Sequence, residues 1–282
     1  MTTSNKRMKS APVSHIRCPV YQASKTGTEI TTARITSERH GITWTVTGRL
    51  GQVHTAIRNV LLSGEYEQIE MSDGAVLVLC DVYGVLRRLG HKSPNAGNAR
   101  WLRDRIEDLR VASLVEDGPD SVTMTGIVYR HQYSKITDSR GRQKYAVVFS
   151  AEYVRSVRQG MSVCFSPAQA QALARMPAVA SAAMQYMWTH RPGAQYRIDT
   201  LLDAIGVSGS KSKMSKDRSK IKAAIESQGA LFGIRINADT VTRTDVDVGV
   251  STHTDTRRRK VSTHTDARSA HTDAVSAHTD AP

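Results

Sequence analysis

One order of secondary-structure elements occurs twice along the chain, and this duplication limits the folds that the sequence can adopt. Helices are assigned from apolar residues spaced three and four apart, and strands from short apolar or alternating runs. The first copy is predicted as a helix, a strand, two helices and two strands, over 52–64, 75–80, 81–90, 99–110, 121–134 and 142–150. The second copy, over about 161–247, repeats this order.

A helix-turn-helix followed by a β-hairpin is the order of a winged helix. We therefore expect an α+β protein with two tandem winged-helix domains, β-hairpin wings and a disordered repetitive C-terminal tail. A hairpin over 29–37 and 42–48 leads into the first domain, and the more basic second helix of the second domain makes that domain the stronger case for DNA contact. The predicted boundaries are a flexible N-terminus over 1–27, winged-helix domains over 28–160 and 161–247, and a low-complexity tail over 248–282.

Two local signals indicate where helices of the second domain begin. Ser166 and Pro167 have the pattern of an N-cap and first helical residue, and Asp199 is predicted to cap the helix that follows it.

No apolar run has the length of a transmembrane helix, and the N-terminus lacks the apolar run of a signal peptide. The three cysteines are far apart, so neither a zinc site nor a disulfide is supported. These features predict a cytoplasmic protein without a membrane partner.

The positive charge is concentrated on the elements that a winged helix presents to DNA. The chain has 39 Lys and Arg against 26 Asp and Glu, a formal charge of +13, which favours a polyanionic partner. Solvated surface faces are the ordinary explanation for one basic helix, but both second helices and the wing are basic. The DNA-binding candidates are Arg100, Arg103 and Arg110 in the first domain, Arg140, Arg142 and Lys144 in its wing, and Ser210, Lys211, Ser212, Lys213, Lys216, Arg218 and Lys220 in the second domain.

The two helices are predicted to divide the work of binding double-stranded DNA. Lysines on the second domain are suited to phosphate contact, and arginines on the first are suited to guanine. Arg103→Ala should then relax base preference, and Lys216→Ala should weaken binding to all duplexes alike.

No pattern of residues indicates catalysis. The stretch GVSGSKS has two residues between its glycines, whereas the Walker pattern has four, and a helix precedes it. Asp199 and Asp203 are explained as a helix cap and a surface acid. We expect no enzyme activity, no catalytic residue, no metal and no cofactor, which disfavours a basic nuclease or relaxase-like enzyme.

Two stretches resemble the iteron-binding plasmid replication initiators, a family with tandem winged helices. They are VLVLCDVYGVLRRLG followed by NAGNARWLRDRIEDLRVASLV, and YRIDTLLDAIGVSGSKSKMSKDRSKIKAAIESQGALFGI. The resemblance implies a plasmid-encoded bacterial protein that binds direct repeats (iterons) at an origin. It also implies recruitment of the host initiator and replicative helicase, and repression of its own gene as a homodimer. In such a protein the first domain would hold the dimer surface, and the second domain would be the main DNA reader. Carried over, Lys211, Lys213, Lys216, Arg218 and Lys220 would contact DNA, with Arg100 and Arg103 on the analogous helix. The alternative is a winged-helix transcriptional repressor that binds a palindromic operator as a dimer.

The C-terminal tail repeats His-Thr-Asp four times. Copies of the surrounding hexapeptide begin at Val250, Val261, Arg268 and Val275, with steps of 11, 7 and 7 residues, or 33, 21 and 21 base pairs of coding DNA. These steps are close to three, two and two turns of B-DNA. The repeat is consistent with translated DNA binding sites, with weak metal binding, with an additional basic arm over 257–260, or with a neutral tail.

Overall fold

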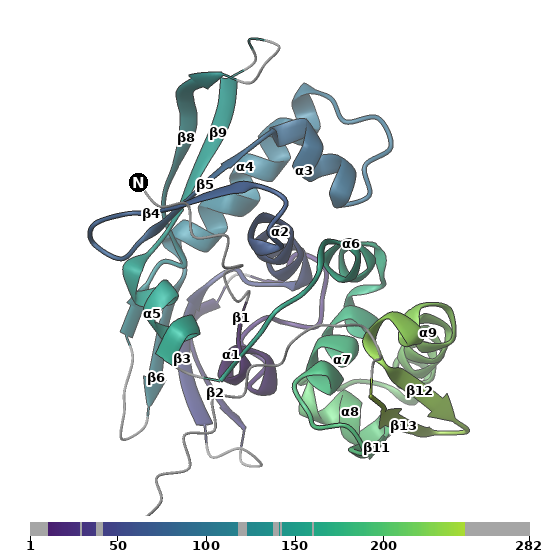
Figure 1. The fold of residues 1–282 in the computed structure, drawn as a ribbon. Coiled ribbons are helices and arrows are strands. Elements are labelled where there is room, and N and C mark those ends of the chain that lie inside the picture. The colour runs from purple at the N-terminus through teal and green to yellow at the C-terminus, as the bar shows by residue number, and fades with distance from the viewer. Residues whose placement is uncertain are drawn as a thin grey trace, which may run out of the picture. The chain divides into compact units, whose positions relative to one another are not determined.

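A computed structural model describes residues 11–28, 30–37, 42–117, 123–137, 141, 143–159 and 161–245 (Figure 1). Within these ranges the chain forms α-helices and four small antiparallel sheets, and no helix there is long and apolar enough to cross a membrane. The predicted tail over 248–282 lies outside the described residues.

The predicted leading hairpin is confirmed. Strands β2 (Ile30–Ser37) and β3 (Ile42–Gly48) pair antiparallel, and β6 (Ser113–Asp117) and β7 (Thr123–Thr125) extend them into a sheet of order β2-β3-β6-β7. The sequence pattern does not predict either of these two added strands as a separate element. The run over 121–134 was predicted as one strand, but Gly126, with φ +81°, separates β7 from the strand that follows.

The prediction of a flexible segment over 1–27 is wrong for residues 11–27. Strand β1 (Ala11–Pro12) pairs with β10 (Ser162–Val163), and α1 (Val13–Arg17) follows directly. Cys18 and Val20 are fully buried. The segment is too short to show an apolar period, so only its packing against distant residues reveals it.

Helix α2 (Gln52–Leu62) is buried on all sides, whereas the sequence indicated a single apolar face. Arg58 is fully buried, and its guanidinium lies 4.8 Å from the centre of the Tyr21 ring. On the polar side, Asn59 Nδ2 donates to Gln185 Oε1 at 3.4 Å, and Gln185 Nε2 donates to Gln52 Oε1 at 3.0 Å. Because these side chains satisfy one another, the polar face of α2 packs against α7 (Ala178–Trp188) without exposure to water.

The duplicated order of elements is present, and the three strands that both copies share have the same order, while the first copy has one additional strand, β4. In each copy one strand comes before the helix pair and a hairpin comes after it, and the first strand pairs with the last strand of that hairpin. These pairs are β5 with β9 and β11 with β13, and the sheets have the orders β4-β5-β9-β8 and β11-β13-β12. The first copy contains α2, β4 (Glu67–Glu70), β5 (Val76–Cys80), α3 (Val82–Arg88), α4 (Ala96–Val111), β8 (Val128–Thr137) and β9 (Gln143–Phe149). The second contains α7, β11 (Gln195–Arg197), α8 (Ile198–Ala204), α9 (Lys211–Gln228), the 3-10 turn η2 (Gly229–Phe232), β12 (Ile234–Asn237) and β13 (Thr240–Arg243).

Two helices connect the copies. Helix α5 (Ala151–Gln159) was not predicted, although Tyr153, Val154 and Val157 provide a buried face at helical spacing. Helix α6 (Pro167–Arg175) begins as predicted, since the Ser166 hydroxyl accepts from Gln169 N at 3.2 Å. The prediction that Asp199 caps the next helix is wrong, because α8 begins at Ile198 and places Asp199 in its first turn.

Candidate nucleic-acid interface

Helix α9 presents a face of serines and one lysine. The Ser210 hydroxyl accepts from Lys213 N at 3.3 Å and begins the helix. Ile221, Ala224 and Ile225 are buried, as is Asp217, and these residues fix which side faces the body. Ser212, Lys216 and Ser219 follow one another at i, i+4 and i+7, and all three are exposed. The short side chains of Ser212 and Ser219 would let the helix backbone approach a binding partner closely, with Lys216 between them.

Most other cations on α9 already have partners. Arg218 Nε lies 2.6 Å from Asp199 Oδ1, Lys220 Nζ 2.9 Å from Asp217 Oδ1, and Lys222 Nζ 2.7 Å from Asp239 Oδ1. Lys213 Nζ donates to the Ser208 carbonyl at 2.7 Å. Lys211 and Lys216 are exposed and form no ion pair with any residue that the structure describes. The positive charge available to a ligand is therefore concentrated in the N-terminal part of α9.

Helix α4 differs from α9 in how its arginines are held. Arg100 is exposed and forms no ion pair within the described ranges. Arg103 Nη1 donates to the Tyr133 hydroxyl at 3.0 Å, and its guanidinium lies 5.7 Å from the centre of the same ring. Arg110 forms two hydrogen bonds to Glu107, at 2.7 and 2.6 Å. Of the three arginines of α4 that the sequence predicts to bind DNA, Arg100 is thus the most available to a ligand.

Glu107 connects α4 to the adjacent hairpin. Its Oε2 also accepts from His131 Nε2 at 2.9 Å, and His131 Nδ1 lies 2.5 Å from the Tyr145 hydroxyl. A proton on Nε2 leaves Nδ1 to accept from the phenol. The Arg110 and His131 hydrogen bonds hold the pKa of Glu107 at about 2. For Glu107 to accept a hydrogen bond from a DNA base, these bonds would have to break.

The effect of pH on stability through Glu107 follows from the direction of its pKa shift, which is downward. A carboxyl whose pKa is lowered in the folded state stabilises the fold fully above its ordinary pKa of 4.5, and that stabilisation is lost as the pH falls toward about 2. Glu107 therefore keeps its negative charge throughout the neutral range. It consistently reduces the positive potential of α4.

We expect Glu107→Gln to strengthen binding to any DNA duplex several-fold, because the change removes a negative charge and frees Arg110. The slope of log affinity against log salt should steepen by about 0.9 if Arg110 gains a phosphate contact. The matched control is Glu70→Gln, since Glu70 is held by Arg158 through two similar bonds at 2.7 and 2.8 Å. Equal gains for the two variants in a salt-titrated binding assay would show that only net charge matters.

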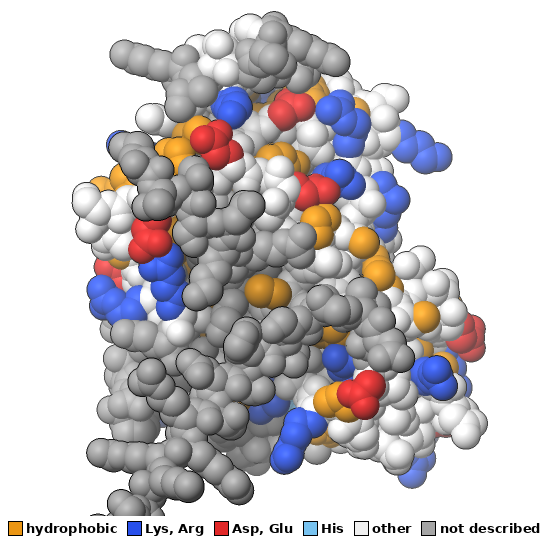
Figure 2. Space-filling view, viewed as in Figure 1, with side chains coloured by type: hydrophobic (Ala, Val, Ile, Leu, Met, Phe, Trp, Pro, Cys, Tyr) orange, Lys and Arg blue, Asp and Glu red, His pale blue; other side chains and the backbone are white. Residues whose placement is uncertain are grey.

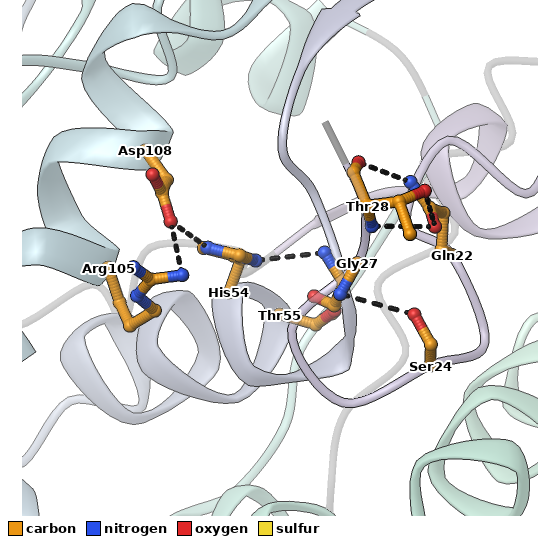
Figure 3. Close-up of polar contacts among 9 residues, drawn as sticks. Gln22, Ser24, Gly27, Thr28, His54, Thr55, Arg105 and Asp108 are labelled. Atoms are coloured by element: carbon orange, nitrogen blue, oxygen red, sulfur yellow. Dashed lines mark hydrogen bonds and ion pairs between the residues drawn. The ribbon is translucent and has the colours of Figure 1, made fainter. Parts of the chain in front are cut away.

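A second acidic residue of α4, Asp108, links this helix to His54 on α2 (Figure 3). Asp108 Oδ2 lies 2.9 Å from His54 Nε2 and 2.8 Å from Arg105 Nη1. His54 Nδ1 accepts the Gly51 N–H at 2.8 Å, so Nε2 carries the proton and donates to Asp108. His54 is fully buried, and this chain of bonds fixes the rotation of α4 and hence the direction of Arg100.

The hairpin β8–β9 runs alongside α4 (Figure 1). On it Lys144 Nζ pairs with Glu67 Oε2 at 3.0 Å, while Arg140 and Arg142 lie outside the described residues. On the same hairpin Tyr129 is 66 % exposed and Tyr133 is 47 % exposed. An alternating strand carries aromatic residues on either face, so the sequence could not separate exposed from buried tyrosines.

The visible surface agrees with this account of paired charges. Figure 2 shows Lys and Arg side chains in separate clusters with Asp and Glu side chains among them, rather than in one continuous basic field. Among the residues that the structure describes, no group of three or more His, Cys, Asp or Glu side chains could hold a metal ion.

The fold so described is mixed α/β, with small sheets and helices in alternation. No protein-family model and no curated protein matches the sequence. A crystal structure of a selenomethionine form of domains 2 and 3 of RctB is similar, with a TM-score of 0.53 and 10 % identity over 76 % of this chain and 84 % of that one. A second structure of RctB domains 2–3 gives a TM-score of 0.49 at 10 % identity, over 75 % and 83 % of the two chains. At this identity the similarity concerns the fold alone.

Proposed function

We propose that the chain is a sequence-specific double-stranded DNA-binding protein with two tandem winged helices, and that it initiates plasmid replication at direct repeats. The observation that carries the proposal is the repeated helix pair and hairpin with the same strand order in both copies. In a winged helix the second helix of the pair enters the major groove. Those positions are held here by α4 and α9, which carry the exposed cations Arg100, Lys211 and Lys216.

The likeness to RctB supports replication initiation as the task of this fold. RctB is a replication initiator. The finer statements rest on the resemblance to iteron-binding initiators: binding of iterons, recruitment of the host initiator and helicase, and autoregulation by a homodimer. A plasmid-encoded cytoplasmic protein that needs no cofactor and has no enzyme activity is part of the same proposal.

The mechanism divides between the two helices. Lys211 and Lys216 would contact phosphates, which position a protein on DNA without reading its sequence. Arg100 would make the bidentate contact with guanine for which an arginine fork is suited. Binding of several copies to phased repeats would bend the duplex, and the energy of binding would be spent on deforming adjacent A·T-rich DNA.

The test is replication in trans. A fragment carrying the origin repeats should replicate in a host that supplies this gene from another molecule, and should be lost when the gene is absent. The Lys211→Ala/Lys216→Ala variant should fail to support replication while accumulating to the native level. A winged-helix repressor would instead bind a palindrome as a dimer and silence a promoter without sustaining the fragment, and that result would refute the initiator assignment.

A further inference from the structure

The repeats of the tail form a regular series that the proposed DNA-binding elements leave unexplained. Three heptapeptides follow one another without a gap, VSTHTDA, RSAHTDA and VSAHTDA, over 261–267, 268–274 and 275–281. An earlier copy, VSTHTD, begins at Val250. It is separated from the series by an insertion of four residues relative to the heptapeptide period.

The spacing of the copies is regular at the level of DNA. Seven codons are 21 base pairs, which is two turns of B-DNA at about 10.5 base pairs each. The four inserted codons add 12 base pairs, which is about one further turn. All copies therefore begin near the same face of the duplex, a property that a peptide function does not require.

The length of the repeat also matches the expected footprint of the protein. Helix-turn-helix units that read successive major grooves are one turn apart, so a chain with two such units covers about two turns. A DNA repeat also encodes a peptide repeat only if its length in base pairs is divisible by three. A repeat of 21 base pairs is divisible by three and is about two turns of B-DNA long. The Thr263-to-Ala270 difference between copies needs one base change, because threonine and alanine codons differ in their first base.

Explanations at the level of the peptide are weaker. A coiled coil needs large apolar residues at two separated positions of each heptad, whereas the only large apolar residue in these copies is the valine at the first position, which Arg268 replaces in one of them. One His and one Asp per copy give only weak and unselective metal sites. The stretch VTRTD over 241–245 is partly similar to the repeat, but it has a role in the folded protein. There Arg243 is buried and donates to the Phe232 and Thr244 carbonyls at 2.6 and 2.7 Å, so the residues serve the fold.

We propose that the DNA encoding residues 250–281 is itself an array of binding sites for this protein. The 3′ end of the gene would then serve two purposes, as coding sequence and as direct repeats that α4 and α9 recognise. This inference rests on the proposed function, since it names the DNA sites that α4 and α9 would bind.

The test compares two duplexes that encode the same peptide. One is the natural coding segment for 241–282, and the other is recoded throughout with synonymous codons at equal length and base composition. The full-length protein should protect the natural duplex from nuclease with a period of 21 base pairs. Its affinity for the natural duplex should exceed that for the recoded one by about 100-fold or more, since several bases change in every copy.

Each outcome is decisive. Equal affinity for the natural, recoded and random duplexes, with the usual dependence on salt, would overturn the inference and leave DNA binding in place. Specific binding to another origin sequence but not to the coding segment would also overturn it. Failure to bind any duplex would refute the proposed function and the inference together.

Discussion

The double variant Lys211→Ala/Lys216→Ala should bind duplex DNA about 100-fold more weakly than the native chain. A hydrogen bond to a charged group contributes about 1.5–3 kcal/mol, and 1.4 kcal/mol corresponds to a tenfold change in affinity. Two lost phosphate contacts at the lower end of this range cost about 3 kcal/mol, which is a factor of about 100. Both side chains are exposed and unpaired within the described part of the chain, so their removal should leave stability nearly unchanged.

The salt dependence identifies the kind of contact that is lost. Each phosphate that a lysine neutralises contributes about −0.9 to the slope of log affinity against log salt. The double variant should therefore lower the magnitude of the slope by about 1.8, measured from about 50 to 200 mM salt. A reduced affinity with an unchanged slope would mean that the two lysines do not contact phosphates.

Two controls separate position from charge. Lys222→Ala removes one positive charge from the same helix, as each single change of the double variant does. Lys222 is paired to Asp239 at 2.7 Å, and we expect little change in affinity. Arg100→Ala should weaken binding to the cognate repeat by about 1–3 kcal/mol while leaving random duplex nearly unaffected. Parallel losses for Arg100→Ala and the lysine variant on both duplexes would contradict the division between base reading and phosphate contact.

Gly126→Ala should destabilise the protein by about 3 kcal/mol or more and weaken DNA binding at a temperature where the native chain is fully folded. Gly126 has φ +81°, and an added Cβ would lie 2.5 Å from the Arg110 carbonyl oxygen and 3.1 Å from that of Val128. Backbone strain and overpacking each cost about 1–3 kcal/mol. The clash pushes on the last turn of α4, so it should also displace the helix that carries Arg100.

Gly74 provides the matched control. Its φ of +86° is similar, but an added Cβ would meet nothing within 4 Å. Gly74→Ala should therefore cost only the strain of the backbone conformation, about 1–2 kcal/mol. Chemical denaturation of both variants measures the difference, and equal losses would show that the close approach of Gly126 to α4 is not a constraint on the fold.

The sequence predicted most helices and strands because their apolar periods and caps are local. Ser166 caps α6 as expected, and Met214, Ile221 and Ile225 face the core of the second copy. Helix α5 was missed despite its apolar spacing. The short strands β1 and β10 were missed because two residues carry no period.

Several features of the candidate interface could not be predicted. The sequence placed Arg110, Arg218 and Lys220 on outward faces, but each is held by an acid. Tyr133, which hydrogen-bonds to Arg103, comes from a strand 30 residues further along the chain. Its proximity follows from the pairing of β8 with β9 beside α4, which no local pattern encodes.

The sequence by itself determined the order of elements, its duplication, the basic character of the second helices and the spacing of the tail repeats. These depend on side-chain periodicity and on residue counts, which are properties of neighbours along the chain. The tertiary structure alone decided which cations remain available, that Arg58 is buried, and that both copies have the same strand order. Those outcomes depend on contacts between residues far apart in sequence, such as Lys144 with Glu67 and Gln185 with Gln52, and such contacts exist only once the chain has folded.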